Sequence, residues 1–425
     1  MNRAILVNKN NKIKESFYKY LQLISINNCN NKEIKIEKET YEQYLKLEEA
    51  LQKQNINIEI EEAYIEDELE TSEYRTGLAI KLKIDSSNYE EVHSLLSKYG
   101  FILRYPKEKE KITGYEYNPT HIRYVGNIIS KIIYENNWTL EEYLKEFSGV
   151  IVVNKEKDMT SFDVVNEISH LFGIKKVGHT GTLDPLAEGV LIVCIGKATK
   201  IVELLTAKDK EYIAGVKLGV KTDTYDITGN ILDTKEVINT DALKEVIKTF
   251  KKTYNQEVPI YSAVKVDGKK LYEYARNNKK VELPKKEVTI KEIEILDRNK
   301  DTFTIKTLVS KGTYIRSLIN DIGNSLNTYA TMTSLIRTKQ GKVTINEAYK
   351  LNDIKNNNFK YYKIEEVLEY PIIKVDDEIE FKISNGVKLL DIYNIEDKVI
   401  FINNKNKLLG IYEKVNEELK VWKNF

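Results

Sequence analysis

Residues 189–205, GVLIVCIGKATKIVELL, constrain the fold of this chain more than any other stretch. The first eight residues carry no charge, and such a run between glycines is typical of a strongly apolar strand, which here leads into a helix. Residues 148–173 predict a strand, a turn and a helix that begins near Thr160 and Ser161. Residues 288–326 predict two strands and then a helix from about Ile315. Together these patterns indicate a mixed α+β fold with a largely antiparallel sheet.

The chain has 425 residues, which suggests two or three domains. In the first 147 residues, helix and strand patterns alternate, and TLEEYLKEF (139–147) has an N-cap at Thr139 with Glu142 three residues later. A new run of strand and helix patterns starts at Ser148. From about Leu351 an Asn- and Lys-rich stretch precedes short strands such as KVIFIN and LKVWKNF. We therefore expect three segments: a small α+β unit at 1–147, the main domain at 148–350 and a β-rich module at 351–425.

Composition excludes several classes of protein. A chain with 41% hydrophobic and 31% charged residues buries real cores and is not disordered overall. The two cysteines, Cys29 and Cys194, provide neither a disulfide framework nor a pair of metal ligands. The N-terminus has no apolar stretch suited to a signal peptide, and no run is long enough to span a membrane. We expect a soluble, cytoplasmic protein that does not associate with membranes.

The net charge of +1 conceals an uneven distribution along the chain. Residues 32–72 contain 13 acidic and five basic residues, a net charge of −8, whereas residues 265–286 contain eight basic and three acidic residues, a net charge of +5. This asymmetry fits one region that avoids polyanions and another that attracts them. Charge alone is equally compatible with a solvated, Lys-rich helix face at 265–286.

The stretch GHTGTLDPLAEGVL (178–191) places one carboxylate, Asp184, among small residues with no base or metal ligand beside it. An Asp-Pro pair by itself is typical of a solvated turn. Four further stretches change this interpretation: KEY (210–212), GVKTDTYDITG (219–229), QEVPIYSAVKVDGKKLYEYAR (256–276) and SKGTYIRSLINDIG (310–323). In this order and spacing they resemble the bacterial tRNA pseudouridine synthase B family, over roughly Ser148 to Gly341.

The resemblance implies an isomerase whose catalytic residues are Asp184, Tyr212 and Arg316. Such an enzyme breaks the N1–C1′ bond of a uridine and rejoins the base through C5, without redox chemistry or phosphate transfer, so we expect no cofactor and no metal. Asp184 would act as a nucleophile or through deprotonation of the sugar, and the sequence does not choose between them. Arg316 would keep the carboxylate charged in a closed pocket. Tyr212 would stack on the target base and help to move the C5 proton, although a core position is the commoner fate of a tyrosine.

The same resemblance assigns further residues to substrate binding. His179 would fill the gap that the flipped base leaves, and Gly181, Thr182 and Leu183 belong to the same motif. Tyr314 would line the pocket, because on a strand it would face the same side as Arg316; a packing position is equally compatible.

The resemblance further implies the target, the uridine at position 55 in the T-loop of tRNA, reached by base flipping. The residues expected to contact its phosphates lie where the family inserts an RNA-gripping segment: Lys265, Lys269, Lys270 and Arg276. We expect a monomer that needs no guide RNA. The family usually has Pro-Pro where this chain has Val258-Pro259, which would loosen that turn. The C-terminal module resembles a PUA-like RNA-binding module, and a packing appendage is the alternative.

Residues 1–147 resemble a different family, the zinc D-alanyl-D-alanine carboxypeptidases (VanY-like), through SEYRTGLAIKL (72–82) and GFILRYPKEKEKITGYEYNPTHIRYVG (100–126). The metal and catalytic positions of that family are here Tyr74, Lys81 and Asn118, and only His121 is left. One imidazole does not build a catalytic zinc site, which needs three protein ligands. We expect a degenerate peptidase fold that positions RNA or a partner, or a fusion without function. An inactive RNA-binding protein is the rival for the whole chain, and a wall peptidase is opposed by the lost ligands.

Overall fold

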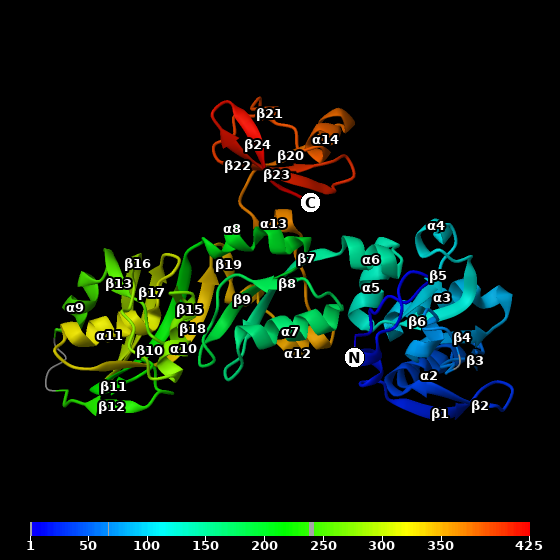
Figure 1. Ribbon diagram of the computed structural model, residues 1–425, viewed down its shortest axis with the longest axis horizontal. Coiled ribbons are helices and arrows are strands. Elements are labelled where there is room, and N and C mark those ends of the chain that lie inside the picture. Colours follow the sequence, from blue (N-terminus) through cyan, green and yellow to red (C-terminus); the bar gives the residue numbers. More distant parts are fainter. Residues whose placement is uncertain (1, 67, 238–241) are drawn as a thin grey trace.

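The computed structural model describes residues 2–66, 68–237 and 242–425, and its main sheets follow one another along the chain (Figure 1). The first 147 residues form a four-stranded antiparallel sheet in the order β3-β4-β6-β5 and a separate β1–β2 hairpin. Its elements are α1 (Glu15–Tyr18), β1 (Leu23–Asn27), β2 (Glu33–Glu37), α2 (Lys38–Gln52), β3 (Glu59–Glu62), β4 (Ala79–Lys83), α3 (Tyr89–Leu96), β5 (Phe101–Tyr105), α4 (Glu110–Thr113), β6 (Asn118–Tyr124), α5 (Asn127–Asn136) and α6 (Leu140–Glu146). The capping box predicted at Thr139 and Glu142 begins α6.

The central part is built on a nine-stranded sheet with the order β13-β16-β17-β10-β18-β9-β7, to which β8 and β19 attach. Every pair in this sheet is antiparallel except β9 with β18. Its elements are β7 (Ser148–Lys155), α7 (Ser161–Phe172), β8 (Val177–His179), β9 (Glu188–Gly196), α8 (Val202–Thr206), β10 (Lys210–Leu218), β11 (Val220–Thr222), β12 (Ile231–Thr234), α9 (Leu243–Thr249), β13 (Thr253–Glu257), β14 (Lys265–Val266), β15 (Lys269–Lys270), α10 (Leu271–Arg276), β16 (Lys285–Arg298), β17 (Thr302–Val309), α11 (Ile315–Ser325), β18 (Ala330–Gln340) and β19 (Val343–Thr344). The mixed α+β class with a largely antiparallel sheet is confirmed.

Strand β9 is apolar throughout because both of its faces are covered. Leu191, Val193 and Ile195 belong to the core that includes α7 and α11. Val190 and Ile192, on the other face, pack in a second core with residues of α8 and of the C-terminal strands. Strand β10 instead alternates buried and half-buried residues, as expected for a strand with one side nearer to solvent.

The C-terminal part is a five-stranded sheet with the order β20-β22-β23-β24-β21, which stands beyond α8 and α13 (Figure 1). Before this sheet begins, the chain packs back on β7, where Val150 and Tyr362 exchange backbone hydrogen bonds of 2.8 Å. The elements are α12 (Leu351–Lys355), α13 (Ile364–Val367), β20 (Ile372–Lys374), α14 (Asp377–Ser384), β21 (Leu389–Leu390), β22 (Lys398–Ile402), β23 (Leu408–Val415) and β24 (Glu418–Asn424).

The first 147 residues share a continuous apolar core with the central part, through α5, α6 and α7. The rings of Phe147 and Phe172 stack at 5.6 Å, and the Tyr143 hydroxyl donates a 2.7 Å hydrogen bond to the Phe172 carbonyl. At Gly173 a Cβ atom would lie 2.3 Å from that of Ala4, so the two parts approach closely there. The N-terminal part is therefore docked against the central part by side-chain packing. Within the described ranges, no helix is long and apolar enough to cross a membrane.

Candidate active site

The loop that carries Asp184 lies between β8 and β9 and is held from both sides. Gly181 has a φ of +122°, which favours glycine, and its carbonyl accepts a 3.0 Å hydrogen bond from the buried Arg337. At Leu183 the backbone N–H donates to the Ser161 hydroxyl at 2.8 Å, and that hydroxyl donates back to the Leu183 carbonyl at 3.2 Å. The first turn of α7 and the buried arginine therefore fix the position of the Asp184 backbone.

Arg316, in the first turn of α11, grips the Asp184 carboxylate with two nitrogen atoms. Its Nε lies 2.8 Å from Oδ2, and its Nη2 donates to Oδ1 at 3.2 Å. The remaining donor capacity is used on backbone carbonyls, at 2.9 Å to Thr224 and 3.0 Å to Tyr261. Because the arginine side chain is only 5% exposed, the guanidinium is fixed in orientation.

Burial and neighbouring charges set the pKa of the Asp184 carboxyl. Burial raises the pKa of its carboxyl above the ordinary value, Arg316 opposes this, and Asp226 adds to the increase. Although 36% of the Asp184 side chain is exposed, the surrounding walls crowd the carboxylate enough for burial to have the largest effect. The Asp226 Oδ2 lies 3.9 Å from Nη1 of Arg316, so the guanidinium is shared between two carboxylates. The predicted pairing of Arg316 with Asp184 is present. It does not fully offset burial, so the pKa of Asp184 stays above its ordinary value.

Asp184 and Arg316 line a cavity of about 410 Å³. Tyr212, Tyr314 and Lys210 also contribute to its wall, together with Gly181, Thr182 and Leu183. Burial, with a smaller contribution from Arg337, lowers the pKa of Lys210 to about 8. The Lys210 ammonium donates to the carbonyls of Thr206 and Lys208 at 2.5 and 2.6 Å.

Tyr314 is not on a strand, as the sequence analysis supposed, but is the N-cap residue of α11. The side chain of Gln256 holds it there, accepting from its backbone N–H at 2.8 Å and donating to its carbonyl at 3.1 Å. Tyr314 and Arg316 still line the same cavity, because the helix begins at its wall. Burial raises the pKa of the Tyr314 hydroxyl.

His179 lies on β8, opposite Val193, and is not among the described residues that line the cavity. Burial and, to a smaller extent, Arg337 lower the pKa of its imidazole, which favours the neutral ring. Its Nδ1 is buried without a hydrogen-bond partner in the described part of the chain.

The four basic residues expected to contact RNA occupy a small arm directly beside the cavity. Lys265 is on β14, Lys269 and Lys270 are on β15, and Arg276 ends α10. The chain enters this arm through residues 262–264, which line the cavity. Lys270 and Arg276 approach the ring of Tyr272 at 5.4 and 5.3 Å. The structure thus brings Lys270, Arg276 and the Tyr272 ring together on an arm that starts at the cavity wall.

At Val258 the structure contradicts the expectation of a looser turn. The Val258 side chain is fully buried, and its N–H donates a 3.0 Å hydrogen bond to the Pro284 carbonyl. Proline has no N–H and could not form this bond. Valine in place of proline at position 258 therefore allows a hydrogen bond between the segment before the arm and residue 284 after it.

The sequence analysis missed the contributions of Asp226, Lys210 and Gln256, which lie in stretches that it quoted, and of Arg337, which lies in none of them. For the first three residues, the only available signal was their place inside these stretches. Their partners are distant in the chain, and nothing in the local pattern separates them from neighbouring polar residues.

In the N-terminal part, the residues at the positions that the sequence analysis matched to metal and catalytic residues make other contacts. The Tyr74 hydroxyl lies 3.3 Å from Nδ1 of His121, and the Lys81 ammonium lies 3.3 Å from a carboxylate oxygen of Glu61. The Asn118 side chain accepts from the backbone of Thr120. Among the described residues, no cluster of three or more histidine, cysteine or acidic side chains could hold a metal ion.

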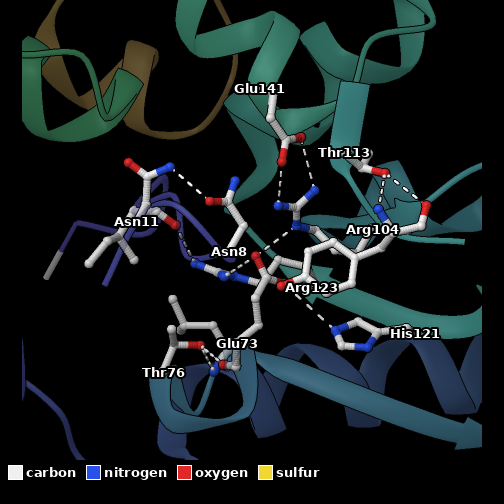
Figure 2. A network of polar contacts seen from close by, with 12 residues as sticks. Asn8, Asn11, Glu73, Thr76, Arg104, Thr113, His121, Arg123 and Glu141 are labelled. Atoms are coloured by element: carbon white, nitrogen blue, oxygen red, sulfur yellow. Dashed lines mark hydrogen bonds and ion pairs between the residues drawn. The ribbon is translucent and has the colours of Figure 1, made fainter. Parts of the chain in front are cut away.

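Beside these positions lies a buried ion-pair network (Figure 2). Glu73 lies 2.7 Å from Nε of Arg104 and 3.1 Å from Nη1 of Arg123, and Arg104 makes two further hydrogen bonds to Glu141 on α6. Burial alone would raise the pKa of Glu73, but the two arginines hold it well below the ordinary value. Because α6 packs on the central part, this network fastens the N-terminal sheet to the interface.

Comparison with known proteins separates the same parts of the chain. Residues 169–315 match the TruB family pseudouridylate synthase (N-terminal domain), and residues 67–127 match the VanY D-alanyl-D-alanine carboxypeptidase family. The tRNA pseudouridine synthase B of Fusobacterium nucleatum is 45% identical over 280 residues, which cover 64% of this chain and 97% of the relative. That of Caldanaerobacter subterraneus is 40% identical over 276 residues, with 64% and 97% covered.

Solved structures agree on the fold. A chain of an H/ACA RNP bound to a substrate RNA containing 2′-deoxyuridine aligns with a TM-score of 0.51 at 23% identity, covering 68% of this chain and 88% of its own. A chain of a Cbf5-Nop10-Gar1 complex gives 0.52 at 24% identity, with 67% and 86% covered. The protein is a pseudouridine synthase, an isomerase, with a VanY-like region in front. Within this class, the chain belongs to the tRNA pseudouridine synthase B family.

Proposed function

We propose that this protein converts uridine 55 in the T-loop of tRNA to pseudouridine, with Asp184 as the group that acts on the nucleotide. The observation that carries the proposal is the Asp184 carboxylate gripped by two nitrogen atoms of Arg316 in the wall of a 410 Å³ cavity. This volume lies within the range of small-ligand sites and suits one everted nucleotide.

The reaction is an exchange of one glycosidic bond for another. The N1–C1′ bond breaks, the base turns, a C5–C1′ bond forms, the C5 proton leaves and N1 gains a proton. The carboxylate assists either by attacking C1′ or by removing a proton from the sugar. A carboxylate with a raised pKa is a better base and nucleophile than a solvated one, which suits either route. Tyr212, in the same wall, would stack on the base and assist transfer of the C5 proton.

Flipping a base out of a stacked loop costs a few kcal/mol, which contacts elsewhere must offset. The arm suits this purpose, because it follows directly on the cavity-lining residues 262–264 and carries Lys265, Lys269, Lys270 and Arg276. Phosphate contacts of this kind position an RNA without reading its sequence. We propose that the protein acts alone on tRNA, as a monomer and without a guide RNA.

The test is tritium release from tRNA transcribed with C5-tritiated uridine, using only the purified protein and the transcript. The wild-type protein should release one equivalent per tRNA, and a transcript with cytidine at position 55 should give none. Asp184→Asn, which keeps the shape of the side chain, should abolish release while tRNA binding persists. Equal release by the wild type and Asp184→Asn would refute the assignment of Asp184. Binding without release by the wild type would instead indicate an RNA-binding protein on this scaffold.

A further inference from the structure

Helix α11 is hydrogen-bonded along one side to β13, the edge strand of the central sheet (Figure 1). The contacts come from Tyr314, Ser317 and Asp321, which are three and then four positions apart and therefore share one face of the helix. Arg316 is one position away from Ser317, so its side chain leaves the helix about 100° from this face. The face that binds β13 thus determines the direction in which Arg316 points.

The side-chain amide of Gln256 is the centre of this contact. The residue is only 1% exposed, and its Oε1 accepts from the Tyr314 N–H at 2.8 Å. Its Nε2 donates to the Tyr314 carbonyl at 3.1 Å and to the Tyr254 hydroxyl at 2.9 Å. Both protons of the amide nitrogen are therefore used. A reversed amide would turn its nitrogen toward the Tyr314 N–H and its oxygen toward the carbonyl, so the hydrogen bonds allow one orientation only.

The Tyr254 hydroxyl extends the contact to a second point on the helix. Tyr254 and Gln256 are two positions apart on β13 and face the same side of the strand. The hydroxyl that accepts from Gln256 donates to Oδ2 of Asp321 at 3.1 Å. Asp321 follows Tyr314 by seven residues, which is about 10 Å along a helix. Strand β13 therefore holds α11 at both ends of this distance.

Ser317 adds a contact between these two points, because its buried hydroxyl donates to the Glu257 carbonyl at 2.8 Å. Apolar packing is not directional, whereas hydrogen bonds are. Three such contacts on one face fix the rotation of α11 about its axis. A small rotation would be magnified at the end of the long Arg316 side chain, which must reach both oxygen atoms of Asp184.

We propose that Gln256 and Tyr254 are positioning residues of the reaction, which act through the start of α11 to orient the Arg316 fork toward Asp184. The inference rests on the proposed function for the role of Asp184. Neither Gln256 nor Tyr254 is among the described residues that line the catalytic cavity, so both act through Arg316 and not on the nucleotide. The alternative is that the contacts of β13 only stabilise the packing of α11.

The experiment uses two variants of the full chain. Gln256→Leu removes all three hydrogen bonds of the amide, and Tyr254→Phe removes only the hydroxyl. The control is Tyr143→Phe, which also removes a buried tyrosine hydroxyl, one that donates to the Phe172 carbonyl at 2.7 Å, far from α11 in the sequence. Tritium release is measured on tRNA labelled at C5 of every uridine, and thermal unfolding checks that each variant is folded.

A misplacement of about 1 Å at a catalytic group can lower a rate about 100-fold. Gln256→Leu should therefore lower kcat about tenfold to 100-fold, with KM within about twofold of the wild type. Tyr254→Phe should lower kcat about threefold to tenfold, as expected for one neutral hydrogen bond. The control should keep both constants within about twofold. A wild-type kcat for Gln256→Leu would overturn the inference.

A double-mutant cycle with Arg316→Lys separates positioning from packing. If Gln256 acts through the fork, Gln256→Leu should lower kcat by no more than about twofold in the Arg316→Lys protein, where the fork is already lost. Losses that multiply would show that the contacts of β13 act independently of Arg316, which would overturn the inference. If Gln256→Leu does not fold, the same cycle with Tyr254→Phe decides.

Failure of the proposed function has a different signature. It fails if the wild type releases no tritium, or if Asp184→Asn releases it as fast as the wild type. Crystal structures of the Gln256→Leu and Tyr254→Phe proteins then decide the inference separately. A guanidinium that no longer contacts both oxygen atoms of Asp184 supports it, and an unchanged fork in both variants overturns it.

Discussion

Replacement of Arg316 by lysine tests the central contact of the site. The arginine makes two contacts to Asp184 and two to the backbone carbonyls of Thr224 and Tyr261. A lysine keeps the positive charge, but its single ammonium cannot reproduce the planar fork that holds both carboxylate oxygens. Loss of one charge-assisted hydrogen bond costs about 1.5 to 3 kcal/mol. At 1.36 kcal/mol per factor of ten, kcat should fall about tenfold to 150-fold.

The assay is single-turnover tritium release at saturating enzyme, together with filter binding of the same tRNA. Arg316→Lys should show the predicted loss in rate with tRNA affinity within about threefold of the wild type. Arg75→Lys, which changes the same residue type in the N-terminal part, is the control and should react normally. Thermal unfolding checks that both variants are folded. A rate for Arg316→Lys within threefold of the wild type would refute the reasoning that the fork is required.

Three further predictions concern charge, backbone and metal. Asp226→Asn removes a negative charge that raises the pKa of Asp184, so the acid limb of the kcat/KM pH profile should move to lower pH; a shift to higher pH would contradict this order of influences. Gly189→Ala introduces a Cβ atom at a φ of +99°, 2.3 Å from the Arg337 carbonyl oxygen. The free energy of unfolding, measured with urea, should fall by at least about 1 to 2 kcal/mol. An unchanged free energy of unfolding would show that β9 and β18 can move apart at little cost. The full chain, with only His121 of the expected zinc ligands left, should hold no stoichiometric zinc by atomic absorption and should not cleave peptides ending in D-Ala-D-Ala; either result to the contrary would restore the peptidase.

In the N-terminal part, the positions that the sequence analysis matched to metal and catalytic residues make packing contacts. The positions that would bind zinc now contact one another and nearby acids, while Glu73, Arg104 and Glu141 connect its sheet to α6. Breaking a buried ion pair by removing one partner is costly, since it leaves an uncompensated charge. The network therefore ties the integrity of this part to its interface with the central part.

Local structure and the chemical motifs could be predicted from the sequence alone. The capping box at Thr139 begins α6 as expected, because a cap depends on residues three positions apart, and α7 begins at the predicted Thr160–Ser161. The alternation along β10 and the apolar run of β9 likewise report burial directly. The identity of Asp184 and Arg316 as a pair came from the resemblance of whole motifs and not from any local pattern.

Tertiary structure alone decided how these groups act on one another. Asp184 and Arg316 are 132 residues apart, and only the tertiary fold brings the loop of Asp184 next to the first turn of α11. The same fold places Asp226 next to the guanidinium of Arg316. It also makes Tyr314 the N-cap residue of α11, where the sequence analysis had supposed a strand. Periodicity encodes which face of an element is buried, whereas charge pairs between distant elements depend on where those elements are packed, and this information is spread over the whole core.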